Sequence, residues 1–548
     1  MHTLIKLLSV IAIIFAIPIS ASAQIWPHIK TFGFDYGGGT TPTAELQWLA
    51  QNHDAVIGMQ DYSLQKINET QYDVMKAANA NVKLFAYMYH TAFTTTAMQE
   101  FCEDWATDNS LNVEDLYIHY YYDTPVKLRT SVTRTTGTGT PSDRICTSDG
   151  TLVSVGASSN YYLSLGYGGG TAATLADARV YQKWNSGWEP KGNHMHSTYY
   201  GAYKAWVLYQ VQVATGKNLD GIFIDTYDGP VLTDYNPSMH YLIEIRAAGQ
   251  NGSDTIARTY YATEMAEMVG QLRTDMRSEL SDSDFIITLN ASEFGYMYNT
   301  SKVALGDQFG ATKLDSVAIE YLATPSKAGY WTIYNYAKTF LDDVHADDLA
   351  SVFAQTDTAW YDYGAYPKPP IGGKQHMIAG FYLFNDPNIY FGVHYGSGAN
   401  YGRRNESGAY ETSDAHFSIS HWDEMMEYDI GTPVVRTGTD FQGNSNTDKM
   451  YIVEQVHGTR YVLARNYTNG KVIVRYEDSN NNTAEDLGTD PRSYDLGGTY
   501  RRLQEDGSLG SPVTTITLGK SEGAIMISNA VKQMYTIGGA LAVPVDSE

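Results

Sequence analysis

Short apolar runs alternate with amphipathic stretches over most of the first 430 residues. The stretches 43–51, 72–79, 199–215 and 256–280 have helical character. Since strands that alternate with helices pair in parallel, the pattern predicts an α/β protein with a (β/α)8 TIM barrel. The eight strands are expected at 30–35, 53–60, 82–90, 221–225, 285–290, 316–321, 349–355 and 377–384.

The alternation is interrupted between about residues 109 and 196. This stretch is rich in Thr, Ser, Gly and Tyr and shows no helical periodicity. Because it is too long for a plain connection, we interpret it as an insertion after strand 3 with small strands of its own. It leaves the barrel at the carboxyl ends of the strands, where loops shape ligand sites, so some of its tyrosines are expected to contact ligand.

The hydrophobic period changes to two beyond residue 431. Six short runs there are separated by turn residues, at 451–456, 461–466, 472–476, 500–503, 513–518 and 524–527. This pattern predicts a C-terminal antiparallel β-sandwich. The expected organisation is a signal peptide over residues 1–23, a barrel over 24–430 and a sandwich over 431–548.

Composition narrows the choice of partner. The chain of 548 residues has 43% hydrophobic and 18% charged residues, which is typical of a globular protein. Its net charge of −24 argues against nucleic acid and anionic membrane surfaces and favours a neutral polymer or a small molecule. The 44 tyrosines suit flat sugar faces but equally suit the faces of β-sheets, so both interpretations stay open.

The first residues predict export from the cytoplasm. Lys6 precedes an apolar run over 7–19, and small residues at 21–23 form a cleavage site before Gln24. No other stretch is apolar enough to span a bilayer, so we expect a secreted or periplasmic protein. In an oxidising compartment Cys102 and Cys146 either form a disulfide or remain two free thiols.

Acidic residues gather at the ends of predicted strands. Glycoside hydrolysis needs two carboxyl groups, and Asp225 and Glu320 suit it best because each follows a rigid apolar run. Asp225 is expected to stay ionised, while burial beside Tyr321 is expected to raise the pKa of Glu320. The alternatives are a capping carboxylate, which also suits Asp228, and a salt-bridged Glu320. The strand-end acids are Asp35, Asp225, Glu293, Glu320, Asp357 and Asp386.

Residues near the same strand ends are predicted to bind substrate: Asp35, Tyr87, Tyr89, His90, Tyr227, Asp228, Asn290, Glu293 and Gln355. We predict no cofactor and no metal, since His90, His194 and His196 lack the spacing of a zinc motif. A nucleophile elbow of the serine hydrolases is absent from the sequence. A polysaccharide lyase is a minor alternative.

Several segments resemble glycoside hydrolases related to the α-galactosidase clan. They are the Leu-Asp-Gly that leads into the Asp225 strand, the Ile-Glu-Tyr around Glu320, the segment 119–124, the segment 429–433 and the tail 498–527. The resemblance covers nearly all of the mature chain. In retaining enzymes of that clan an Asp on strand four is the nucleophile and an acid on strand six is the acid/base, which implies these roles for Asp225 and Glu320. The Glu at the second position and the long insertion depart from the clan's pattern.

Two hypotheses of function follow. The first is a secreted glycoside hydrolase that cleaves O-glycosidic bonds of a poly- or oligosaccharide with two carboxylates and retention of configuration. The second is a carbohydrate-binding barrel that has lost catalysis, because a fold does not fix a function. A single acid in the barrel mouth would favour the second.

Overall fold

The structure is a computed structural model that describes part of the chain. The described residues are 29–35, 41–59, 67–89, 93, 95–119, 145–146, 152–153, 161–163, 179–184, 187–225, 243–250, 252–290, 316–319, 351–357, 373–394, 424–440, 443–457, 460–476, 491–504, 506–519, 522–528, 536–537 and 540–541.

Eight parallel strands form a closed barrel. Each strand pairs in parallel with its neighbour, and Thr31 pairs in parallel with Phe391 to join the last strand to the first. The Phe391 amide donates to the Lys30 carbonyl oxygen at 2.8 Å, which completes the ring. The predicted α/β barrel is therefore confirmed. Its strands are β1 (Phe32–Asp35), β2 (Ala55–Met59), β3 (Lys83–Tyr89), β11 (Gly221–Asp225), β12 (Ile286–Asn290), β13 (Ser316–Ile319), β14 (Ser351–Asp357) and β15 (Ile389–His394).

Helices follow several of these strands and have local signals at their ends. Asn68 and Gln71 form a capping box at the start of α3, and the Ser253 side chain accepts from the Ile256 amide at the start of α8. The predicted helix at 199–215 ends earlier, because β9 (Gln212–Ala214) and β10 (Lys217–Asn218) form a hairpin there. The helices are α2 (Thr43–Asn52), α3 (Glu69–Ala78), α4 (Thr96–Asp108), α5 (Ser197–Val211), α7 (Ile243–Ala247), α8 (Asp254–Leu280) and α12 (Gly373–Phe384).

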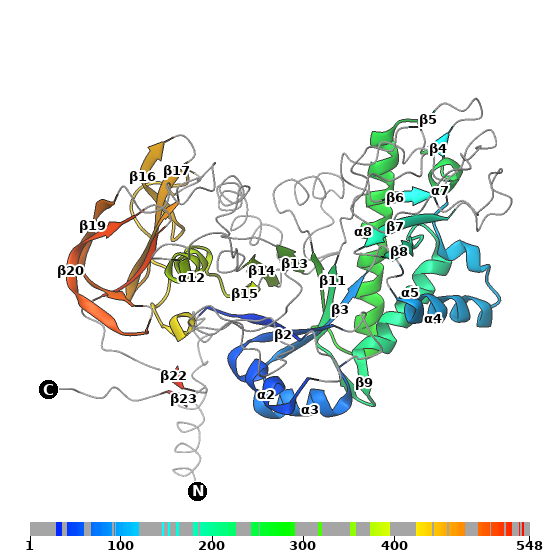
Figure 1. Cartoon of the computed structure of the whole chain (residues 1–548), viewed down its shortest axis with the longest axis horizontal. Helices are drawn as coiled ribbons and strands as arrows, with labels where there is room; N and C mark the ends of the chain where they lie inside the picture. The colour runs from blue at the N-terminus through cyan, green and yellow to red at the C-terminus, as the bar shows by residue number, and fades with distance from the viewer. Residues whose placement is uncertain are drawn as a thin grey trace, which may run out of the picture.

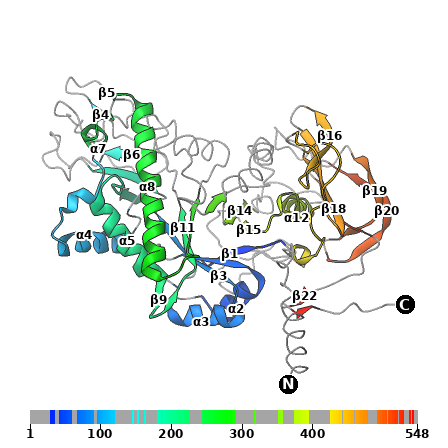
Figure 2. The ribbon, with the colours of Figure 1, turned by 180° about the vertical axis from the view of Figure 1, so that it is seen from behind.

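The predicted eighth strand at 377–384 is wrong. These residues belong to α12, and the eighth strand is β15. The run is apolar on all sides because α12 lies between the barrel and the C-terminal sheet, where it contacts β17, β18 and β21 (Figures 1 and 2). A short, uniformly apolar run does not distinguish a buried helix from a buried strand. Asp386 consequently precedes β15 and lies at the opposite end of that strand from the one predicted.

Aromatic rings fill the barrel interior. Phe353 lies edge-on to Phe32 and to Phe85 at centroid distances of 5.1 Å, and it stacks on Tyr390. Gly392 leaves room for one of these rings, since a Cβ there would come within 2.5 Å of Phe32. The interior cluster consists of Phe32, Phe34, Ala55, Ile57, Phe85, Tyr87, Phe223, Ala318 and Phe353.

The insertion has the predicted small strands. In both views its described strands lie beside the first half of α8, whose last residues lead into the start of β12 (Figures 1 and 2). The insertion therefore lies toward the carboxyl ends of the barrel strands, the side predicted from the sequence. Its elements are the 3-10 helix η2 (Val113–Leu116), β4 (Ile145–Cys146), β5 (Leu152–Val153), β6 (Tyr161–Leu163), β7 (Val180–Trp184) and β8 (Gly187–Pro190).

The C-terminal strands are antiparallel, as predicted. Those described form one continuous sheet in the order β16-β17-β18-β21-β19-β20. The sheet curves so that residues from its two halves, such as Val462 of β17 and Ile516 of β20, share one buried cluster. Its strands are β16 (Tyr451–His457), β17 (Arg460–Asn466), β18 (Gly470–Tyr476), β19 (Arg492–Leu503), β20 (Leu509–Leu518) and β21 (Gly523–Ser528). A short 3-10 helix, η6 (Glu424–Glu427), and the hairpin β22 (Thr536–Ile537) and β23 (Ala540–Leu541) complete the elements.

Candidate functional site

Asp225 is the last residue of β11 and the centre of a buried polar group. One carboxylate oxygen, Oδ2, accepts a short hydrogen bond from the Tyr87 hydroxyl. The other, Oδ1, accepts from the Asn290 side-chain amide at 2.6 Å. The exposed fractions of Asp225, Tyr87 and Asn290 are 8%, 7% and 1%. Three adjacent strands, β3, β11 and β12, thus bring these side chains together.

Strand alternation explains why the three side chains meet. Phe223 and Tyr87 both belong to the barrel interior, and Asp225 follows Phe223 by two residues, so it lies on the same side of its strand. The Tyr87 ring stacks on Phe223 at 5.6 Å with an interplanar angle of 17°. The carboxylate therefore stands at the carboxyl end of the barrel, next to a packed aromatic layer. Polar contacts in such a dry setting are stronger than in water.

Asp35, another predicted substrate contact, is the last residue of β1. It is fully buried at the end of β1 and accepts a hydrogen bond of 2.5 Å from the Thr41 hydroxyl. Since Phe34 faces the barrel interior, the neighbouring Asp35 side chain lies on the opposite side of the strand. Its hydrogen bond with Thr41 therefore helps to hold the segment that leads into α2, and its predicted contact with substrate stays a prediction.

The remaining predicted site residues are described in part or not at all. Tyr89 pairs with Asp225 and Gln355 pairs with Gly392, so the backbones of both lie in the barrel wall. Five others lie outside the described residues: His90, Tyr227, Asp228, Glu293 and Glu320. In the part of the chain that the structure describes, no cluster of metal-ligating side chains is found. In that same part, no helix combines the length and apolarity needed to cross a membrane.

His194 and His196, at the end of the insertion, both contribute to the local structure. His196 caps α5, where its Nδ1 accepts from the Thr198 amide at 3.2 Å. His194 is buried and lies edge-on to Tyr261 with ring centroids 4.4 Å apart. Capping and packing account for the spacing of this pair.

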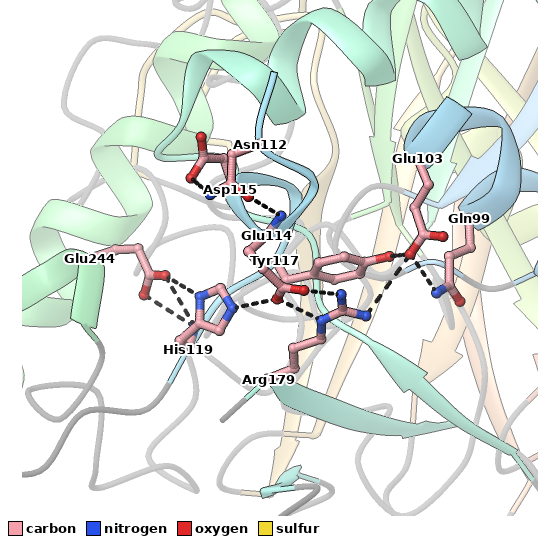
Figure 3. A network of polar contacts seen from close by, with 9 residues as sticks. All are labelled: Gln99, Glu103, Asn112, Glu114, Asp115, Tyr117, His119, Arg179 and Glu244. Carbon is pink, nitrogen blue, oxygen red and sulfur yellow. Dashed lines mark hydrogen bonds and ion pairs between the residues drawn. The ribbon is translucent and has the colours of Figure 1, made fainter. Parts of the chain in front are cut away.

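A second polar group ties the insertion to the barrel (Figure 3). Glu114 of η2 accepts from the Arg179 Nε at 2.9 Å and makes a second, short bond with the same guanidinium. The guanidinium carbon lies 3.7 Å from the centroid of the Tyr117 ring. The Tyr117 hydroxyl in turn donates to Glu103 of α4. Charged residues from three separate segments thus share one cluster.

His119 extends this cluster to α7 (Figure 3). Its Nδ1 lies 3.0 Å from a carboxylate oxygen of Glu244, and its Nε2 lies 3.2 Å from one of Glu114. Burial opposes ionisation of Glu114, yet the hydrogen bonds from Arg179 and His119 outweigh burial and lower the pKa of this carboxyl. The cluster therefore holds its charges as a network and anchors α7, the helix that follows β11.

The pattern of the sequence does not predict this network. Arg179 and Glu114 are 65 residues apart in a region without periodicity, and only their pairing in space identifies them. Tyr87 and Asn290 were predicted as substrate contacts. The structure shows both bonded to Asp225, a relation that strand-end position alone does not reveal.

Comparisons with known proteins give distant likenesses. No family model matches the chain, and no curated protein matches it. Isomaltulose synthase from Erwinia rhapontici NX5 is 10% identical with a TM-score of 0.46, over 91% of this chain and 98% of that one. The PgaB (BpsB) glycoside hydrolase domain from Bordetella bronchiseptica is 12% identical with a TM-score of 0.35, over 66% and 93%. A GH18 chitinase from Pseudoalteromonas aurantia is 12% identical with a TM-score of 0.29, over 66% and 93%. At this similarity the likenesses carry no argument about the activity of this chain.

Proposed function

We propose that this protein is a glycoside hydrolase that cleaves O-glycosidic bonds of a poly- or oligosaccharide with two carboxylates. The observation that carries the proposal is the position of Asp225. It ends a barrel strand at the face where barrel enzymes have their active sites, and two side chains hold its carboxylate there. A carboxylate fixed on a rigid element suits attack on an anomeric carbon.

Glu320 is the proposed acid/base partner. It lies outside the described residues, so its role rests on the sequence. It directly follows β13, in step with Ser316 and Ala318 along the chain. Ala318 belongs to the barrel interior, and Ser316 accepts a hydrogen bond from Thr288 of the neighbouring strand at 2.9 Å. By strand alternation Glu320 is expected on the same side of the chain as Ala318. A carboxylic acid on that side is suited to protonate a leaving oxygen.

Retention of configuration and export complete the proposal. Retention is supported by the clan resemblance, in which the strand-four Asp acts as a nucleophile. Export is supported by the basic start, the apolar run and the small residues before Gln24. The mature protein should then begin at Gln24, which N-terminal sequencing of the exported protein tests directly.

The activity is tested with the purified mature protein on a panel of neutral polysaccharides and activated aryl glycosides. Release of reducing sugar is expected, and Asp225→Asn should lower it by at least about a thousandfold because the amide cannot attack. Glu320→Gln should impair substrates with poor leaving groups far more than aryl glycosides, which depart without protonation. Binding without hydrolysis on every substrate would replace the proposal with a carbohydrate-binding barrel, and unsaturated products would indicate a lyase.

A further inference from the structure

We propose that Tyr87 and Asn290 are positioning residues that hold Asp225 in its ionised form, and that they are not contacts to the sugar. This inference rests on the proposed function. It adds to that function a physical reason, the hydrogen bonds to Asp225, for Asp225 to be the nucleophile and another carboxyl group the proton donor.

The geometry fixes the carboxylate at two points. Tyr87 donates to Oδ2 from β3 on one side, and Asn290 donates to Oδ1 from β12 on the other. Each oxygen is thus engaged by a different strand, and rotation of the Asp225 side chain would break both bonds. A group held in this way keeps one orientation toward a substrate above the barrel.

The donors also select the charge of the group. In this arrangement the Asn290 amide nitrogen can only donate, and the acceptor it prefers is a carboxylate oxygen. With Tyr87 donating to the second oxygen, the pair offers two hydrogen bonds to the anion. Because all three side chains are more than nine-tenths buried, little water is present to replace a lost donor. Asp225 is therefore suited to attack, and the proton donor has to be another carboxyl group.

The Tyr87 hydroxyl is itself held in place. Its ring stacks on Phe223 and lies edge-on to Phe34 at a centroid distance of 6.4 Å. The aromatic layer of the barrel thereby orients the Tyr87 hydroxyl toward Asp225. Tyr87→Phe removes only the hydroxyl and leaves this stacking in place.

The first test compares Tyr87→Phe and Asn290→Ala with the parent protein on the substrate found in the panel. Each should lower kcat about tenfold or more, with KM changed less than about threefold, because positioning acts on the attacking group and not on sugar binding. The acidic limb of the pH profile should move upward by about one pH unit in each variant, since the anion has lost a donor. Tyr390→Phe, which alters another tyrosine of the same barrel, is the matched control and should leave kcat and the acidic limb of the pH profile unchanged.

The second test does not depend on activity. In protein labelled with 13C at aspartate carboxyls, the resonance lost in Asp225→Asn identifies this group. Its protonation midpoint should move upward by about one pH unit in Tyr87→Phe and stay in place in Tyr390→Phe. An unmoved midpoint, or a raised KM with unchanged kcat, would overturn the inference. An Asp225→Asn protein with full activity would instead refute the proposed function, and the midpoint would still decide the role of Tyr87.

Discussion

Acid should destabilise this protein through His376, a residue of α12 that is buried against the C-terminal sheet. Its side chain is 2% exposed, and a Cβ added at Gly523 of β21 would lie 2.9 Å from the His376 Cα. Burial lowers the pKa of His376 to about 4, against a smaller opposing effect of a backbone hydrogen bond at Glu522. In the unfolded chain the same group has a pKa of about 6.5.

The direction and size of the effect follow from these two values. Between about pH 6.5 and pH 4 the unfolded chain binds the proton and the folded protein does not, so the free energy of unfolding falls as the pH falls. A pKa difference of about 2.5 units corresponds to about 3 kcal/mol, because each unit is worth about 1.4 kcal/mol. Stability from this source is complete above about pH 6.5 and lost by about pH 4.

The assay is denaturant unfolding of the parent and His376→Gln at a series of pH values. Gln stays neutral throughout, so the difference between the two free energies of unfolding isolates the histidine from the carboxylates of the chain. The parent should lose about 3 kcal/mol relative to the variant between pH 7 and pH 4. His196→Gln serves as a control, because that side chain is 43% exposed. Parallel pH curves for the parent and His376→Gln would show that protonation of His376 does not destabilise the folded protein.

Two further changes test the packing of the insertion and of the barrel. Arg179→Met removes the cation between Glu114 and Glu103 and should lower the free energy of unfolding by about 2–4 kcal/mol, whereas Lys204→Met at a more exposed ion pair should cost under about 1 kcal/mol. Equal small losses would show that the network of Figure 3 adds little stability. Gly392→Ala places a methyl group within 2.5 Å of the Phe32 ring and should cost about 1–3 kcal/mol in denaturant unfolding. Phe32→Leu should recover part of that loss in the double variant, and a strictly additive loss would contradict the proposed clash.

Periodicity predicted most of the architecture because buried strands and amphipathic helices leave strong patterns in a sequence. The first seven barrel strands and the six antiparallel strands near the C-terminus follow from it. The helix α12 was mistaken for a strand because it is covered on both sides, so its polar face is missing from the sequence. Burial by another part of the chain cannot be seen in a local window.

The candidate site, like the fold, could be predicted from the sequence only in part. Asp225 was predicted because an acid at the end of an apolar strand is a local pattern. The roles of Tyr87 and Asn290 depend on neighbours 138 and 65 residues away in the sequence, and those of Asp35 and Thr41 on which side of β1 faces the barrel interior. Hydrogen-bond partners of this kind depend on the register between strands, which composition and spacing leave undetermined.

The proposed attack of Asp225 on the sugar is tested by trapping the covalent intermediate that it would form. A 2-deoxy-2-fluoro glycoside of the sugar found in the panel slows both the formation and the hydrolysis of the glycosyl-enzyme. A good leaving group makes formation faster than hydrolysis, so the intermediate accumulates. Peptide mass spectrometry should then show the fluorosugar attached to Asp225 and no adduct in Asp225→Asn. An adduct on another carboxylate, such as Glu293, or hydrolysis with inversion and no adduct would show that Asp225 is not the nucleophile.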